Sequence, residues 1–251
     1  MKKNIKILLL ILCALLLVAC GSKEENKSTK KESNTEQKEQ KPKNGEKEEN
    51  KGGVEVLKED KNGEITEGVI ENYHFKETEK VTNHVKIQME DGGVILIVLS
   101  NSQSPITIKN FQKLVKEKFY DGIIFHRVIS NFMIQGGDPT GTGASGSKET
   151  IKGEFAVNGV QNNLSHVRGT VSMARKGAKY ETEEQWNSAS SQFFIVVQDS
   201  TFLDGNYASF GKVFAGMDTV DRIRYVTTDS NDRPIEDQKM KSIRFIELIE
   251  D

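Results

Sequence analysis

The sequence has almost no cysteine. Only Cys13 and Cys20 occur among its 251 residues, and none follows Cys20. The long remainder of the chain can therefore form neither a disulfide nor a thiolate metal site. Its stability must come from an ordinary apolar core.

Several common patterns for catalysis, nucleotide binding or metal binding are missing or incomplete as well. No Gly-x-Ser-x-Gly elbow is present, which argues against a hydrolase. Gly141 to Gly146 satisfies the dinucleotide-binding glycine pattern, but no helical pattern follows it, so nucleotide binding is not expected. No metal spacing such as His-Glu-x-x-His occurs among the four histidines, which are His74, His84, His126 and His166.

The longest apolar run lies near the N-terminus, from Ile7 to Val18, after three lysines. It is short for a membrane span and ends in small residues, as a secretory signal does. The ending Leu17-Val18-Ala19-Cys20-Gly21 resembles the lipobox of bacterial lipoproteins, in which a signal peptide is cut before a cysteine that carries lipid. We therefore expect residues 1–19 to be a signal peptide and Cys20 a lipidation site. The lipid would anchor the chain to the bacterial cell membrane on its extracytoplasmic side; an uncleaved anchor is the alternative.

No apolar residue occurs from Gly21 to Gly53, where Lys and Glu dominate. Such a segment cannot bury enough surface to offset its chain entropy, so we expect residues 20–53 to be a disordered charged tether. As a flexible coil it would span about 30 Å root-mean-square. Its opposite charges nearly balance, so nucleic-acid binding is not expected. Wall binding by these charges is the alternative to a plain tether.

Regular patterning begins near residue 81. Residues 54–80 mix scattered apolar residues with acids, which indicates one or two short strands or an extension packed on the main domain. In residues 81–251, Asp91-Gly92-Gly93 predicts a hairpin turn, and Val94–Leu99 is apolar on both faces, as in a strand covered on both sides. Helices are expected after the Ser104-Pro105 start signal and over Met217–Arg224. Further strands are predicted at Thr170–Ala174, Phe193–Val197, Phe210–Val213 and Ile243–Ile249. This pattern favours a mainly β fold, a closed antiparallel barrel capped by two α-helices.

The stretch from Phe125 to Asp138 carries the strongest chemical signal. Read as two strands, it places Arg127 and His126 on opposite faces, and we expect His126 to pack in the core. An arginine stays protonated at working pH, so it is a poor general base but a good hydrogen-bond donor through its rigid fork. Phe132 and Met133 are expected to form an apolar floor beside it. A donor above such a floor suits a flat ring with an amide, such as a prolyl peptide.

A family resemblance is carried by five ordered blocks: Phe125-His126-Arg127-Val128-Ile129; Phe132-Met133-Ile134-Gln135-Gly136-Gly137-Asp138; Ser172-Met173-Ala174; Ser191-Gln192-Phe193-Phe194; and Phe202-Leu203-Asp204-Gly205 with Phe210-Gly211-Lys212-Val213. They look like a cyclophilin, a peptidyl-prolyl cis-trans isomerase. The likeness runs from about His84 to Ile249. It implies an eight-stranded antiparallel barrel with a helix at each end, in agreement with the pattern above.

The resemblance also implies site residues. Arg127 would donate to the prolyl nitrogen, and Gln135 would orient Arg127 or contact the substrate backbone. No bond is broken in the reaction, so no nucleophile, metal or cofactor is needed, only a preference for the twisted peptide over both planar isomers. Phe193 and Ile195 are expected in the barrel core. The proline pocket and its groove would be formed by Phe132, Met133, Phe194 and Leu203, with Ala174 and Gln192 at the border.

The chain departs from the family pattern at three positions of this site. Phe202 replaces a common tryptophan, which predicts weak cyclosporin binding with activity retained. Tyr207 replaces a histidine and can still close the pocket. Arg175 replaces a common asparagine and is expected to add positive charge at the groove. Trp186 either contacts clients from a loop near the groove or packs locally on the domain surface.

Together these observations predict a lipid-anchored, extracytoplasmic prolyl isomerase that assists the folding of secreted or surface proteins. The alternative is a non-catalytic module that holds proline-containing segments as a chaperone or a surface adhesin. Retention of Arg127 with its apolar surroundings favours the enzyme.

Overall fold

A computed structural model of the chain describes residues 53–99, 102, 104–177 and 181–250. The predicted signal peptide, the lipidation site Cys20 and all of the tether except Gly53 lie outside the described residues. None of the helices within the described ranges is long and apolar enough to cross a membrane.

Eight antiparallel strands form the predicted barrel, in the order β11-β4-β5-β10-β8-β9-β7-β6. The barrel closes because β6 pairs with the start of β11, with Phe125 opposite Gln238 and Ile124 opposite Lys239. The strands are β4 (His84–Met89), β5 (Val94–Leu99), β6 (Ile124–Ile129), β7 (Met133–Gly136), β8 (Thr170–Met173), β9 (Phe193–Val196), β10 (Ser209–Ala215) and β11 (Gln238–Ile249).

The barrel core follows from strand alternation. Inward-facing residues such as Ile95, Phe193 and Ile195 are fully buried in one large cluster. Phe111 of helix α1 (Pro105–Lys116) closes this cluster, with its ring 5.7 Å from that of Phe193 and 5.1 Å from that of Phe210. The prediction that Phe193 and Ile195 belong to the core is confirmed.

The described part of the chain has three α-helices, so the prediction of two was incomplete. Helices α1 and α3 (Met217–Arg224) lie where they were expected, and α2 (Glu183–Trp186) is a single short turn. Short 3-10 turns are η1 (Ala156–Asn158) and η2 (Thr201–Leu203). Trp186 is partly buried against the barrel core, and its indole nitrogen donates to Glu181 at 2.9 Å, which favours the local-packing alternative.

Ser104 precedes α1, as the start signal predicted, but its side chain does not cap the helix. The Ser104 hydroxyl donates to the carbonyl of Ser209 at 2.6 Å instead of binding the first turn of α1. The carboxylate of Glu154 accepts the free N–H groups of Ile106 at 3.0 Å and Thr107 at 2.8 Å. A distant acid therefore satisfies the helix start and complements its dipole.

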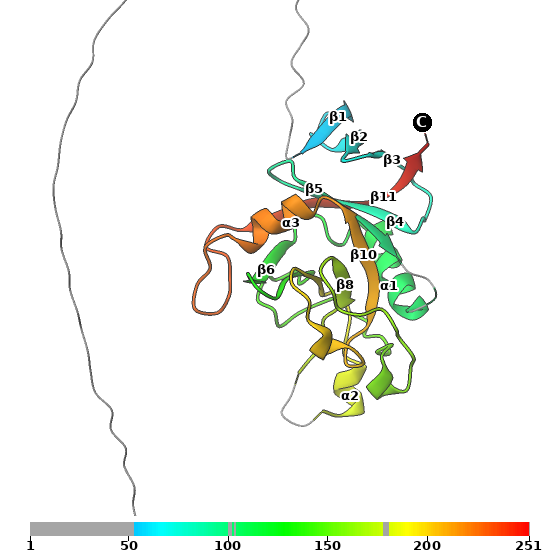
Figure 1. Ribbon diagram of the computed structural model, residues 1–251, viewed down its shortest axis with the longest axis vertical. Coiled ribbons are helices and arrows are strands. Elements are labelled where there is room, and N and C mark those ends of the chain that lie inside the picture. The colour runs from blue at the N-terminus through cyan, green and yellow to red at the C-terminus, as the bar shows by residue number, and fades with distance from the viewer. Residues whose placement is uncertain (1–52, 100–101, 103, 178–180, 251) are drawn as a thin grey trace, which may run out of the picture. The chain divides into compact units, whose positions relative to one another are not determined.

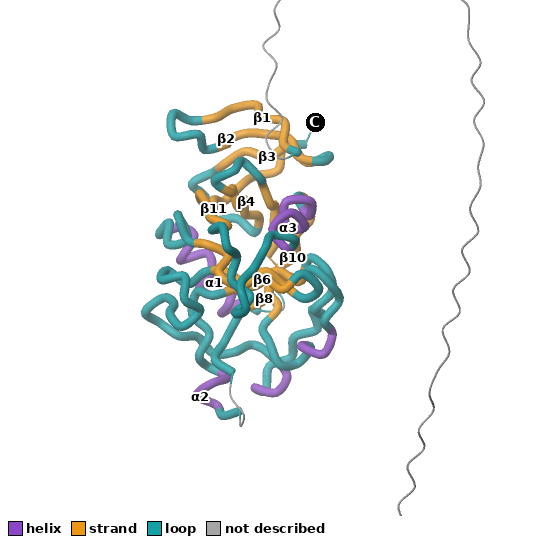
Figure 2. Tube along the Cα trace, turned by 90° about the vertical axis from the view of Figure 1, so that its left-hand side faces the viewer, coloured by secondary structure: helices purple, strands orange, loops and turns teal. Residues whose placement is uncertain are grey.

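Residues 54–77 form three strands rather than one or two: β1 (Val54–Glu59), β2 (Ile65–Ile70) and β3 (Tyr73–Glu77). We call these three strands the extension. β3 pairs with the second half of β11, from His74 opposite Ile249 to Glu77 opposite Ile246. The extension lies near the C-terminus, at the end opposite α2 (Figures 1 and 2).

The extension explains the two-sided apolar pattern of β5. Ile95, Ile97 and Leu99 enter the barrel core, whereas Val94 and Leu96 join a second buried cluster. That second cluster includes residues of the extension, namely Val54, Ile65, Ile70 and Phe75. The strand is therefore covered on both faces, as predicted.

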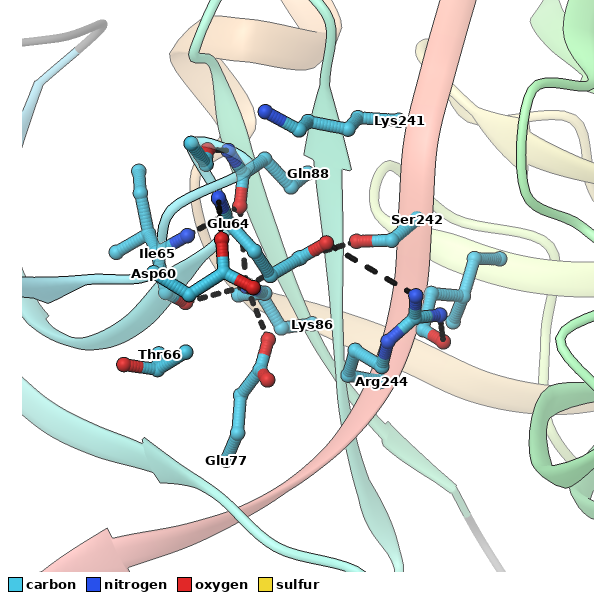
Figure 3. Close-up of polar contacts among 12 residues, drawn as sticks. Asp60, Glu64, Ile65, Thr66, Glu77, Lys86, Gln88, Lys241, Ser242 and Arg244 are labelled. Atoms are coloured by element: carbon cyan, nitrogen blue, oxygen red, sulfur yellow. Dashed lines mark hydrogen bonds and ion pairs between the residues drawn. The ribbon is translucent and has the colours of Figure 1, made fainter.

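A buried lysine links the extension to the barrel (Figure 3). Lys86 of β4 is fully buried, and its ammonium lies 2.9 Å from Glu64, just before β2, and 2.6 Å from Glu77 at the end of β3. It also donates to Gln88 at 3.1 Å. Burial raises the pKa of Glu77 despite the lysine. We call Lys86, Glu64 and Glu77 the junction triad.

Candidate active site

A row of side chains crosses the outer face of the barrel wall. Arg127 on β6 lies opposite Gln135 on β7, Gln135 lies opposite Phe194 on β9, and Phe194 lies opposite Ser172 on β8. Directly opposite residues share a face, so the row brings a cation, an amide and an aromatic ring together. His126 is buried, as predicted.

Arg127 stands next to an irregularity in the sheet. The register of β6 against β7 shifts between Phe125 and Arg127. A bulge of this kind bends the strand and changes the direction in which a side chain points. The alternation of the sequence does not reveal it.

A cavity of about 260 Å³ opens on this face. Its floor is a small apolar cluster separate from the barrel core, formed mainly by Met133, Phe194, Val196 and Leu203. The volume is near the lower end for ligand pockets, which suits a small ring rather than a large cofactor. The cavity is lined by Arg127, Phe132, Met133, Gln135, Ala174, Arg175, Gly177, Phe194, Leu203 and Tyr207.

Two predicted site residues lie outside this cavity. Phe202 is 71% exposed, and its ring is 5.6 Å from the ring of Phe132 at the rim. Gln192 lines a neighbouring cavity of about 440 Å³, which it shares with Gln135 and Ala174. All other predicted pocket residues line the first cavity.

Gln135 is held by Gln192. Its amide donates to the Gln192 oxygen at 2.9 Å, and Gln192 in turn donates to the carbonyls of Gly143 at 3.0 Å and Ser145 at 2.6 Å. The described hydrogen bonds include none between Gln135 and Arg127. Of the two roles expected for Gln135, contact with the substrate backbone therefore stays a prediction, and orientation of Arg127 is not seen.

Arg175 does not add free positive charge to the groove, so that expectation was wrong. Its side chain is only 2% exposed, and one terminal nitrogen lies 2.9 Å from each carboxylate oxygen of Glu181. The guanidinium carbon lies 4.7 Å from the ring centre of Tyr207 and 5.3 Å from that of Phe155. The charge is neutralised by Glu181, and the side chain supports the Tyr207 wall of the cavity.

His166 does not line the cavity but supports its floor from behind. It is fully buried behind Phe194, with the two rings stacked 6.0 Å apart. Its Nδ1 lies 2.8 Å from Asp204, and its Nε2 lies 3.0 Å from the hydroxyl of Ser172. Within the described ranges, no group of three or more His, Cys, Asp or Glu residues could hold a metal ion.

The buried histidines predict a loss of stability in mild acid. Burial lowers the pKa of His166, although Asp204 acts in the opposite direction, and burial likewise lowers the pKa of His126 against the effect of Asp138. A folded pKa below the unfolded value near 6.5 means that the unfolded chain takes up protons first as the pH falls. Stability is therefore complete above about pH 7.5, and below pH 6.5 each such histidine lowers it by up to about 1.4 kcal/mol per pH unit.

Thermal unfolding measured from pH 7.5 to 5.5 checks this expectation. The melting temperature should fall with pH, and His126→Gln should make the fall shallower. Asp138 does not titrate in this window, because hydrogen bonds from Thr140 outweigh its burial and hold its pKa at about 2. A melting temperature that stays constant across the window would contradict the prediction.

Comparisons with known proteins agree with this geometry. Residues 84–245 match the family model of the cyclophilin type peptidyl-prolyl cis-trans isomerases. The chain is 44% identical over 149 residues to peptidyl-prolyl cis-trans isomerase ppi1 of Schizosaccharomyces pombe, covering 59% of this chain and 90% of that protein. It is 40% identical over 168 residues to a peptidyl-prolyl cis-trans isomerase-like 1 protein of Gibberella zeae, covering 66% of this chain and 97% of that protein.

Solved structures give the same result. The crystal structure of a Cryptosporidium parvum cyclophilin type isomerase superposes with a TM-score of 0.58 at 34% identity, covering 67% of this chain and 98% of that one. A second structure of that protein, in the presence of the dipeptide Ala-Pro, gives a TM-score of 0.56 at 33% identity, covering 64% and 97%. The family match spans well over half of the sequence and includes seven strands of the barrel and most of β11. The chain therefore belongs to the cyclophilin family of peptidyl-prolyl cis-trans isomerases.

Proposed function

We propose that the chain isomerises X-Pro bonds by donating a hydrogen bond from Arg127 to the prolyl nitrogen while the proline ring occupies the apolar cavity. The barrier to rotation is roughly 18–20 kcal/mol because the nitrogen shares its lone pair with the carbonyl. The lone pair becomes available once the bond twists, so a donor at that nitrogen stabilises the twisted state more than either planar isomer.

The observation that carries this proposal is the composition of one cavity. Arg127 and the apolar floor of Met133, Phe194 and Leu203 line the same space of about 260 Å³. The second cation on its wall, Arg175, is held by Glu181. The Ala-Pro dipeptide used with the Cryptosporidium relative supports a prolyl ligand for this chain as well.

A protease-coupled assay with a prolyl tetrapeptide tests the proposal. The wild-type chain should accelerate cis-to-trans conversion in proportion to its concentration, and Arg127→Ala should lose most of that acceleration. Equal rates for the two proteins would remove the arginine from the mechanism.

We further propose that the substrates are secreted or surface proteins met outside the cytoplasmic membrane. The support is the lipobox-like ending at Cys20 and the charged segment that follows it. Two lipid chains would suffice for stable anchoring, since each buried methylene adds about 0.8 kcal/mol. Expression in a bacterium with labelled palmitate should give a labelled, membrane-bound protein. Cys20→Ser should abolish the label, and retention of the label by this variant would contradict the lipid assignment.

Weak cyclosporin binding is also expected. Phe202 lacks the indole N–H that a tryptophan would offer at this rim position, so one hydrogen-bond donor is missing. Phe202→Trp should therefore bind cyclosporin about tenfold more tightly, the equivalent of one net hydrogen bond, with isomerase activity close to that of the parent. Inhibition curves for the two proteins measure the difference. No gain in affinity would refute the role given to this position.

A further inference from the structure

The loop between α3 and β11, residues 225–237, reaches the strand that carries Arg127 (Figure 1). Asp232 at its tip makes two contacts there. Its carboxylate Oδ2 lies 3.4 Å from Nε of Arg127, and its backbone carbonyl accepts the N–H of Val128 at 2.8 Å. One residue thus contacts both the side chain of Arg127 and the backbone next to it.

The backbone of Asp232 is in an unfavourable conformation for a residue with a side chain. Its φ is +63°, and among the described residues only Glu71 and Lys118 share a positive φ without being glycine. Glycine would adopt this conformation at lower cost if only the turn mattered. Aspartate adopts this conformation more readily than most residues with a side chain, so the turn can present a carboxylate toward Arg127.

The surrounding loop holds this conformation in place. The carboxylate of Asp229 accepts the N–H of Asn231 at 2.8 Å and of Arg233 at 3.0 Å, and its backbone N–H donates to the carbonyl of Arg233 at 2.8 Å. Arg233 also donates to the carbonyl of Gly141 and pairs with Asp237 at 3.0 Å. The contacts of Asp229 and Arg233 fix the loop on both sides of Asp232 in the sequence, so the Asp232 carboxylate is held in a defined position next to Arg127.

The contact with Asp232 occupies only the Nε of the Arg127 guanidinium. Asp232 approaches Nε, and the described residues make no other hydrogen bond to the Arg127 side chain. The two terminal nitrogens of the fork therefore stay available to a ligand. Without Asp232, a long side chain that is 42% exposed would sample several rotamers.

We propose that Asp232 is a positioning residue that holds Arg127 by Nε, so that its terminal nitrogens face the prolyl bond. This inference rests on the role proposed for Arg127. Loss of the carboxylate should lower kcat more than it raises KM, because the apolar floor that binds the proline ring is untouched.

Three variants test the proposal in the prolyl peptide assay, each with its melting temperature. Asp232→Gly keeps the positive φ and removes the carboxylate, and should lower kcat/KM about 3- to 10-fold through kcat at an unchanged melting temperature. Asp232→Asn tolerates the same backbone and keeps an acceptor oxygen, so it should recover most of the loss. Glu236→Gln removes one negative charge from an exposed position of the same loop that has no part in holding the tip, and should behave like the parent.

A double-mutant cycle separates this inference from the proposed function. In an Arg127→Ala background, Asp232→Gly should cause no further loss, because the residue acts through the arginine. A full-sized loss in that background, or a parental rate for Asp232→Gly alone, overturns the positioning role and leaves Arg127 as the donor. A parental rate for Arg127→Ala overturns the proposed mechanism and the inference together.

Discussion

Arg127→Ala should lower kcat/KM for a prolyl peptide by about 100- to 1,000-fold, the loss typical of removing one donor that acts only in the transition state. KM should change little, because the apolar floor binds the proline ring in both planar isomers. Within the described cavity wall, the other cation is paired with Glu181 and cannot take over the role. Rates from the coupled assay and peptide affinity by NMR titration separate the two effects.

Arg127→Lys distinguishes charge from geometry. Lysine keeps a positive charge but lacks the planar fork, so we expect a rate at least about tenfold below the parent. Arg222→Ala is the matched control, because this half-exposed arginine on α3 pairs with Asp91 of the turn between β4 and β5, away from the cavity. The parent's rate should also be nearly flat from about pH 6 to 8, where histidine titrates. A steep rise near pH 6.5, or full activity in Arg127→Ala, would point to His126 instead.

Much of the barrel and the pocket could be predicted because both follow from short-range alternation. The strands that carry Arg127 and Met133 alternate between a core face and an outer face. Strand β9 alternates in the same way, so Phe193 enters the core and Phe194 forms part of the cavity floor. A sheet converts this two-residue period directly into two surfaces. Arg127 and Met133 could therefore be placed from local sequence, whereas Gln135 and Phe194 were implied by the family resemblance.

The remaining features depend on contacts between residues that no periodic pattern links. Glu154 caps a helix that begins 49 positions earlier in the sequence at Pro105, and Asp232 meets Arg127 across 105 positions. Arg175 was expected to add unpaired positive charge to the groove, because its partner Glu181 lies in a polar stretch without periodicity. The local sequence pattern does not determine which donor each carboxylate contacts, so these pairings could be identified only from the structure.

Lys86→Ala should be the most destabilising single change at the extension, with an expected loss of about 3–5 kcal/mol in the free energy of unfolding. The substitution leaves the buried Glu64 and the half-buried Glu77 without their shared ammonium, and only Arg244, 3.9 Å from Glu64, remains as a nearby cation. Burial already raises the pKa of Glu77 with the lysine in place, which shows how poorly this carboxylate is solvated. For a domain of this size the melting temperature should fall by roughly 6–20 °C.

Lys80→Ala supplies the control, because Lys80 pairs with Glu247 at 3.2 Å while 80% exposed, and removal of such a pair costs at most about 1 kcal/mol. Adding Glu64→Gln and Glu77→Gln to Lys86→Met should recover much of the loss, since the whole set of buried charges is then absent. If Lys86→Ala were no more harmful than Lys80→Ala, the junction triad would not be what holds the extension. Where Lys86→Ala does lower stability, hydrogen exchange locates the loss, because release of the extension alone exposes β1 to β3 while the barrel amides stay protected.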